Sequence, residues 1–130
     1  MSTIFKKIID GEIPCHKIAE DDRFLAFLDV RPVKPGHTLV IPKREVDYIF
    51  DLDDALLGGI MLFARPVAKA IQKVVPCQKV GVTVIGLEVR HTHVHLIPVN
   101  AIGDINFANA RAEDPARLAD MAARIRAALG

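Results

Sequence analysis

The chain has 130 residues, of which 51% are hydrophobic and 25% charged, and its formal net charge at neutral pH is +1. These values are typical of one soluble globular domain over residues 1–130, and they exclude an intrinsically disordered chain. A net charge this small creates no overall field that attracts nucleic acid or an anionic membrane, so we expect neither partner, and any phosphate binding must be local.

The sequence contains no recognisable targeting or membrane-spanning segment. No apolar run approaches the length of about eighteen residues that a membrane span needs, and no signal-peptide core follows Lys6 and Lys7. We therefore expect a cytoplasmic protein. Cys15 and Cys77 lack the spacing of metal ligands and are too few for a disulfide framework, so both are expected to be reduced and structural.

The N-terminal part of the chain predicts a short helix followed by a hairpin. Apolar residues within 3–9 recur at helical spacing until an Asp-Gly pair stops the pattern. Residues 16–20 and 23–30 are interpreted as two strands joined by a polar tip. His16, at the start of the first strand, is interpreted as a surface residue.

The next strand is predicted over residues 37–41 and ends at Pro42, where proline interrupts the strand pattern. Alternation of side chains turns His37, Leu39 and Ile41 to one face. Because His37 is a polar residue at the start of an otherwise apolar face, we expect it at the rim of that face.

The second half predicts two helices and a strand between them. A long helix is predicted to begin with Asp51 as its N-cap, and its apolar face carries Leu56, Ile60, Phe63, Val67, Ile71 and Val74. Residues 80–85 alternate as a strand. After a loop or edge segment at 103–111, the pair Asp114-Pro115 predicts a C-terminal helix at about 115–129, docked on the domain or on a partner subunit.

Residues 86–98, GLEVRHTHVHLIP, contain three of the five histidines of the chain. In an extended strand, residues two apart point the same way and lie roughly 6.6–7 Å from each other, so His91, His93 and His95 share one face. The other face is apolar enough to pack on a core and carries Thr92, Val94 and Leu96. The strand therefore has one side for chemistry and one for packing.

Three interpretations of this histidine row remain open on spacing alone. The rings can be solvated polar residues, although the strict two-residue spacing of a rare residue argues against this. They can bind a metal, but same-face strand positions lie far apart for one ion and the row contains no carboxylate. They can also act at phosphorus, where one neutral imidazole attacks while its neighbours donate hydrogen bonds.

Four blocks of the sequence, in the same order, resemble the histidine triad (HIT) family. They are His-x-His-x-His followed by two apolar residues, the run HTLVIPK that begins about fifty residues upstream at His37, and the N-terminal stretches IFKKIIDGEIPC and EDDRFLAFLDV. The two N-terminal stretches are similar to the Hint-like nucleotide-binding branch of the family. The likeness covers residues 4–98 and leaves 99–130 as a C-terminal extension.

The resemblance implies a HIT-like α+β fold with an antiparallel sheet of about five strands, one main helix, a short N-terminal helix and a C-terminal helix. It implies a homodimer whose sheets join into one larger sheet. The implied activity is hydrolysis at the α-phosphate of nucleoside 5′-phosphate derivatives, such as AMP phosphoramidates, related adenylyl conjugates or dinucleoside polyphosphates. The implied partner is an AMP-like small molecule, and no cofactor is required.

The resemblance also assigns roles to residues of this chain. His93 is the nucleophile that forms a covalent nucleotidyl intermediate, His95 donates hydrogen bonds near the leaving group, and His91 and His37 orient the rings. Asp29 accepts hydrogen bonds from the ribose hydroxyls, since one carboxylate can accept from both. The base pocket is assigned to Ile4, Phe5, Ile8, Phe27, Leu28 and Val30.

Two residues depart from the family pattern. Leu87 stands where a glutamine usually lies, in a link without the Asn-containing loop of many relatives, so a donor to the phosphate is missing. Glu88 occupies a position that faces the phosphate in relatives, where its carboxylate repels a dianion but attracts an amine leaving group. These departures leave a second interpretation open, a nucleotide-binding regulatory module with little or no turnover.

Some bacterial relatives hold a structural zinc with a Cys-x-x-Cys near the N-terminus and a later histidine. This chain has Thr3, Lys6 and Glu45 at those places. No such zinc is expected, and no metal ligand is assigned.

Overall fold

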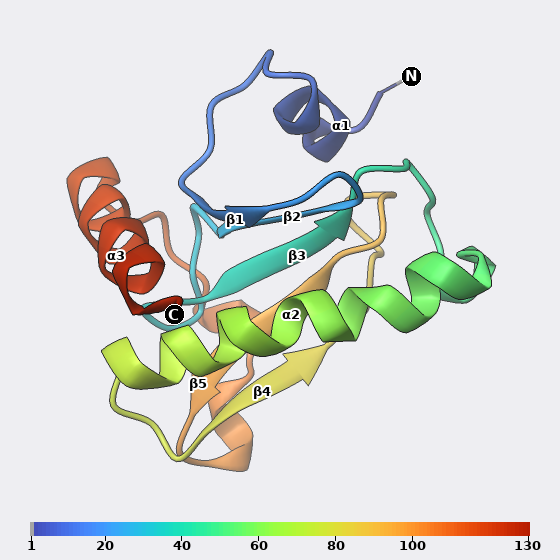
Figure 1. The fold of residues 1–130 in the computed structure, drawn as a ribbon. Helices are drawn as coiled ribbons and strands as arrows, with labels where there is room; N and C mark the ends of the chain where they lie inside the picture. Colours follow the sequence, from blue (N-terminus) through green and yellow to red (C-terminus); the bar gives the residue numbers. More distant parts are fainter. Residues whose placement is uncertain (1) are drawn as a thin grey trace.

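The computed structural model describes residues 2–130, which form one antiparallel sheet and three α-helices. The strands are β1 (Lys17–Glu20), β2 (Phe24–Leu28), β3 (Thr38–Pro42), β4 (Lys79–Thr83) and β5 (Val94–Val99), and the helices are α1 (Ile4–Ile9), α2 (Asp54–Val74) and α3 (Pro115–Ala128). The strand order is β1-β2-β3-β5-β4, as Figure 1 shows with α2 lying along the sheet. The predicted α+β fold is confirmed.

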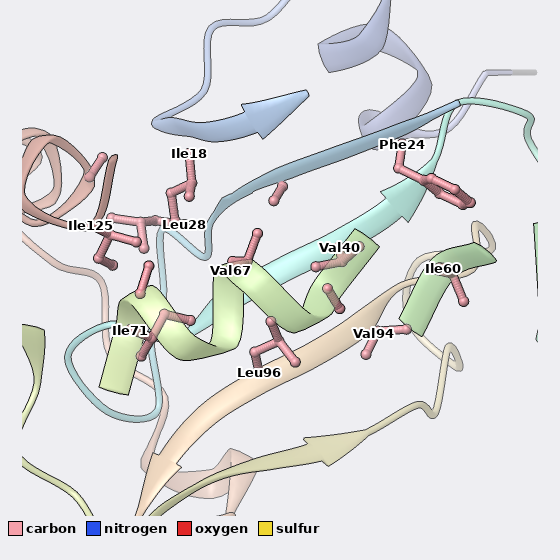
Figure 2. Close-up of a cluster of buried hydrophobic side chains, with 14 of the residues drawn as sticks. Ile18, Phe24, Leu28, Val40, Ile60, Val67, Ile71, Val94, Leu96 and Ile125 are labelled. Carbon is pink, nitrogen blue, oxygen red and sulfur yellow. The ribbon is translucent and has the colours of Figure 1, made fainter. Parts of the chain in front are cut away.

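The main core lies between the sheet and helices α2 and α3. Val67 and Ile71 of α2 pack with Val40 of β3 and Leu96 of β5. Ile125 of α3 belongs to the same buried cluster and lies beside β2 (Figure 2). The buried face of α2 is the one that its apolar spacing predicts.

The opposite face of the sheet is covered by α1. Phe5 packs there on a second buried cluster made of Leu25, Phe27, Leu39 and Ile41. Because both faces are covered, all residues of β2 and β3 are buried and these strands do not alternate between apolar and polar residues. The histidine face of β5 lies on this second side.

Two predicted elements begin two or more residues later than the sequence indicates. Helix α2 is capped by Asp53, whose carboxylate accepts the Leu56 N–H at 2.9 Å, while Asp51 ends a short 3-10 turn. Leu52 between them is extended and buried, which breaks the helix pattern.

Strand β5 begins at Val94 rather than at the first histidine of the row. The last β3 residue that pairs with β5 is Val40, opposite Val94. Before this point, the N–H and hydroxyl of Thr92 both bond the Val46 carbonyl at 2.7 Å, so the segment pairs with a loop instead of the sheet.

The turn before β3 depends on glycine. Gly36 has a φ of +92°, and a Cβ on it would lie 2.9 Å from Cγ2 of Val75 at the end of α2. This turn places the next residue, His37, directly at the start of β3.

The C-terminal helix α3 begins as predicted at Pro115, with the Asp114 carboxylate accepting the Ala116 N–H at 2.9 Å. It packs on α2 and β1 of its own chain. Among residues 2–130, none of the helices combines the length and apolar character needed to span a bilayer.

Candidate active site

The three histidines of the row line one side of the sheet, next to α1. The Phe5 ring lies 6.0 Å from the ring of His91 and 5.0 Å from that of His93, and the rings of His93 and His95 are 4.8 Å apart between centroids. All three side chains are buried, with His93 and His95 each 7% exposed. Val94, between His93 and His95, and Leu96, directly after His95, point to the main core.

His37 meets the row from the neighbouring strand. Its Nε2 lies 2.9 Å from Nδ1 of His95, and its Nδ1 accepts the backbone N–H of Val33 at 3.0 Å. Because Nδ1 of His37 is an acceptor, the proton of that ring must be on Nε2, which donates to His95. His95 therefore carries its own proton on Nε2, the nitrogen that remains free to donate.

His93 has the complementary tautomer. Its Nδ1 lies 2.7 Å from the backbone carbonyl of His91, and a carbonyl oxygen only accepts. The proton is therefore on Nδ1, and Nε2 of His93 keeps an unshared lone pair. This arrangement makes Nε2 a nucleophile without removal of a proton.

His91 is held at both ring nitrogens and is the most enclosed of the three. Its Nε2 donates to the Pro42 carbonyl at 2.8 Å, and the hydroxyl of Thr3 lies 3.3 Å from its Nδ1. Thr3 is also the N-cap of α1, where it accepts the Lys6 N–H. His91 therefore joins the helix to the end of β3 and fixes the carbonyl that orients His93.

Burial favours the uncharged form of His37, His91 and His95. It lowers the pKa of His37 and His91, and it lowers the pKa of His95 to about 3, with the neighbouring His93 and His37 rings acting in the same direction. The Asp29 carboxylate, 3.7 Å from Nε2 of His37, opposes this shift in His37. A neutral ring has one N–H donor and one nitrogen acceptor, as the hydrogen bond from His37 to His95 requires.

Asp29, His37 and His95 also form a group with the reach of a metal site, since one ligand atom from each lies within 4.8 Å of the others. Binding an ion there needs a lone pair on Nε2 of His37. That nitrogen must instead carry the proton while Val33 donates to Nδ1. The hydrogen bonding favours a proton between the rings over a metal ion.

Two clefts open onto His93 and His95. The larger cleft, about 440 Å³, is lined on one side by Phe5, Asp29 and Leu39. The smaller cleft, about 240 Å³, is lined by Ile85, Gly86 and Leu87. Glu88 and Phe107 line both clefts, together with the two histidines.

The structure brings together some of the other predicted site residues. Asp29 lines the larger cleft, and its Oδ1 accepts the Arg31 N–H at 2.9 Å, which leaves its second oxygen directed toward His37. Phe5 lines the same cleft, and Phe27 lies behind it with 5.7 Å between the ring centroids. Ile8 packs on the edge of this cluster.

Three of the residues assigned to the base pocket lie elsewhere. Leu28 is 2% exposed in the main core, on the helix-covered face, because adjacent strand residues point to opposite faces and Phe27 takes the other one. Val30 is 57% exposed beyond the end of β2, and Ile4 is 50% exposed in a shallow pocket with Val89 and Arg90. The structure therefore places Leu28 on the other side of the sheet from Phe5 and the histidines.

Sequence reasoning missed residues that come from irregular segments. Arg31, Arg111, Phe107 and Ala108 line the larger cleft, and the last three belong to the segment interpreted only as a loop or edge. The two arginines place positive charge in the cleft that holds Glu88. No hydrophobic periodicity in the sequence indicates these positions. Arg31 and Arg111 lie near each other because the Arg111 N–H donates to the Pro32 carbonyl at 3.4 Å.

Comparison with known proteins identifies similar chains. The model of the HIT domain family matches residues 10–102. Adenosine 5′-monophosphoramidase hnt1 of Schizosaccharomyces pombe is 41% identical over 100 residues, which cover 75% of this chain and 74% of that protein.

Solved structures agree with this similarity over almost the full length. A Hit-like protein of Bartonella henselae, described as involved in cell-cycle regulation, has a TM-score of 0.86 at 33% identity and covers 98% of this chain and 97% of its own. A zinc-bound histidine triad family protein of Mycobacterium smegmatis has a TM-score of 0.84 at 30% identity, over 99% of this chain and 94% of its own.

Proposed function

Because this chain belongs to the HIT domain family, we propose that it hydrolyses the bond between the α-phosphate of a nucleoside 5′-phosphate derivative and its leaving group. AMP phosphoramidates and related adenylyl conjugates are the proposed substrates, with dinucleoside polyphosphates as a further class. The observation that carries the proposal is the tautomer of His93, whose Nδ1 proton is held by the His91 carbonyl so that Nε2 is free.

The proposed reaction has two displacements at phosphorus. Nε2 of His93 forms a bond to the α-phosphorus while the bond to the leaving group breaks, and the leaving group takes the Nε2 proton of His95 as it departs. Water then attacks the same phosphorus, gives one proton back to His95 and breaks the bond to Nε2 of His93, which releases the nucleoside monophosphate and restores neutral His93. One water molecule therefore supplies, over the two steps, both the hydroxyl that ends on phosphorus and the proton that replaces the one taken by the leaving group.

Neighbouring groups support this reaction without a metal ion. The Nε2–H of His95 is available to donate to a phosphate oxygen or to the leaving atom, because the Nδ1 of that ring is occupied by His37. Arg31 and Arg111 line the larger cleft and offset the repulsion between Glu88 and the phosphate.

The larger cleft is the proposed nucleoside site. Asp29 would accept hydrogen bonds from the ribose hydroxyls through the oxygen that Arg31 leaves free, and Phe5 and Leu39 offer apolar surface to the base. Phe27 and Ile8 support Phe5 from behind. We also propose that the protein acts in the cytoplasm and as a homodimer.

A regulatory module with little turnover is the second candidate. It is favoured by Leu87, which stands at the position of the usual glutamine and is 71% exposed at the smaller cleft, where its side chain offers no hydrogen-bond donor. This hypothesis keeps nucleotide binding but predicts no covalent chemistry.

A turnover assay separates the two candidates. Wild-type protein is expected to release AMP from adenosine 5′-phosphoramidate, and His93→Ala is expected to lower kcat by at least about 10³-fold because the nucleophile is lost. His16→Ala, which changes the histidine outside the site, serves as the matched control and keeps wild-type kcat. Activity should also survive a strong chelator.

Two outcomes would count against the hydrolase. AMP that binds to wild-type protein without any turnover of phosphoramidate supports the regulatory module. Activity that disappears in chelator and returns with added metal points to a metallohydrolase instead.

A further inference from the structure

Phe107 lies beyond residue 102, where the match to the HIT domain model ends. It begins a 3-10 turn, Phe107–Asn109, between β5 and α3, and the HIT domain match ends at residue 102. Its ring stands edge-on to His95 with 4.8 Å between centroids and lies 6.3 Å from the ring of His37. An aromatic side chain from outside the matched region therefore contacts the histidine pair.

The segment is held in place on both sides of this ring. Before it, the Asp104 carboxylate lies 3.4 Å from Nζ of Lys34 and accepts the Asn100 and Ala101 N–H groups. After it, the Glu113 N–H donates to the Val30 carbonyl at 3.1 Å. These anchors join the segment to the loop that carries Asp29 and His37, so the position of the ring is set by contacts outside the ring itself.

The Phe107 ring lines both clefts. The larger cleft contains Asp29 and Phe5, and the smaller one contains Ile85 and Leu87, while Phe107 lines both of them along with His93 and His95. In an in-line attack the leaving group lies opposite Nε2 of His93, while the nucleoside oxygen is an equatorial substituent of the phosphorus, so the nucleoside and the leaving group extend from the phosphorus in different directions. If the nucleoside occupies the larger cleft, the leaving group has the smaller cleft of about 240 Å³.

We propose that Phe107 is a specificity-determining residue that limits the size of the leaving group by separating the small cleft from the large one. This inference rests on the proposed hydrolase activity. Apart from the two histidines and the Glu88 carboxylate, the walls of the small cleft are apolar. This lining suits a small amine whose carbon substituents are uncharged and whose nitrogen becomes cationic after release.

Paired substrates test this role. Adenosine 5′-phosphoramidate has ammonia as its leaving group, and the corresponding amide of a bulky arylalkyl amine has a large one. In Phe107→Ala the clefts merge, and the ratio of kcat/KM for the bulky substrate to kcat/KM for the small one is expected to rise by about tenfold or more. Phe107→Tyr keeps the ring and should keep the wild-type ratio.

The control variant is Asn109→Ala, which changes the same 3-10 turn but does not line either cleft. It should leave the ratio unchanged. Because Phe107 is 38% exposed, the alanine variant is expected to fold, and its melting temperature should stay close to that of the wild type.

The possible results separate this inference from the proposed function. If Phe107→Ala hydrolyses both substrates with the wild-type ratio, the hydrolase stands and the role of Phe107 is overturned. An equal loss on both substrates also overturns that role, because the ring would then only support His95. If wild-type protein hydrolyses neither substrate, the proposed function fails and the inference falls with it.

Discussion

At the scale of single residues, the site depends on which nitrogen of each ring carries a proton. The Val33 N–H fixes the tautomer of His37, which fixes that of His95, and the His91 carbonyl fixes that of His93. These contacts involve backbone groups that lie next to the rings only in the folded chain. The sequence indicates that the histidines share a face, but it does not indicate which nitrogen is free.

The low pKa of His95 has a consequence for stability. Its pKa is about 3 in the folded protein, against a usual value of 6.5 for an exposed histidine. Between these values the unfolded chain binds a proton that the folded chain does not, so stability falls as the pH falls below 6.5. From pH 6.5 to 4.5, the titration of His95 alone is expected to lower the free energy of unfolding by roughly 2 kcal/mol, and His37 and His91, whose pKa values are also lowered by burial, add to the drop.

Urea unfolding at several pH values measures this dependence. His95→Gln removes one of the titrating rings, so its loss of stability over the same pH range should be smaller than in the wild type. Parallel curves for the variant and the wild type would show that His95 is not the group responsible.

Adjacent residues show what strand alternation says about the predicted site. Asp29 lines the larger cleft, and Phe27 faces Phe5. Leu28 could not share that face, because neighbouring strand residues alternate. The alternation rule that groups the histidines on one face therefore also separates Leu28 from Phe27.

At the scale of elements, the helices and strands follow from periodicity and caps, while the irregular segments do not. The sequence predicts which face of α2 is apolar and predicts that α3 begins at a proline. Phe107 and Arg111 lie in short turns whose place depends on contacts with the loop after β2, such as the Arg111 N–H bond to the Pro32 carbonyl. No local pattern encodes such a contact.

Strand β4 lies at the edge of the sheet and carries exposed apolar surface. Val82 on this strand is 48% exposed, and Leu62 on the adjoining helix α2 is 61% exposed. An unpaired edge with apolar side chains is a surface on which a second copy can continue the sheet. This is the surface that we expect the proposed homodimer to use.

Charge at this edge should break the dimer. Val82→Asp places a carboxylate in the proposed interface, and the dissociation constant should rise at least about tenfold, a cost of about 1.4 kcal/mol. Val30→Asp makes the same change on an exposed valine away from that edge, beyond the end of β2, and should have no effect. Sedimentation velocity measures both; a wild type that stays monomeric at high concentration refutes the proposed dimer.

At the scale of the whole molecule, the site is assembled from segments distant in the chain. Helix α1 supplies Phe5, the loop after β2 supplies Asp29 and Arg31, and the segment around β5 supplies His93 and His95. The turns before α3 add Phe107. The resemblance to the HIT family covered the first three of these segments but not the turns before α3. It therefore predicted the histidines and did not predict Phe107.

The central claim is that Nε2 of His93 bonds covalently to the α-phosphorus, and trapping that bond tests it most directly. Wild-type protein mixed with an adenylyl phosphoramidate and quenched early should gain the mass of one adenylyl group, located on His93 by peptide mass spectrometry. His93→Ala should gain none. An adduct on another residue, or rapid turnover in wild-type protein with no adduct at any quench time, would contradict the account.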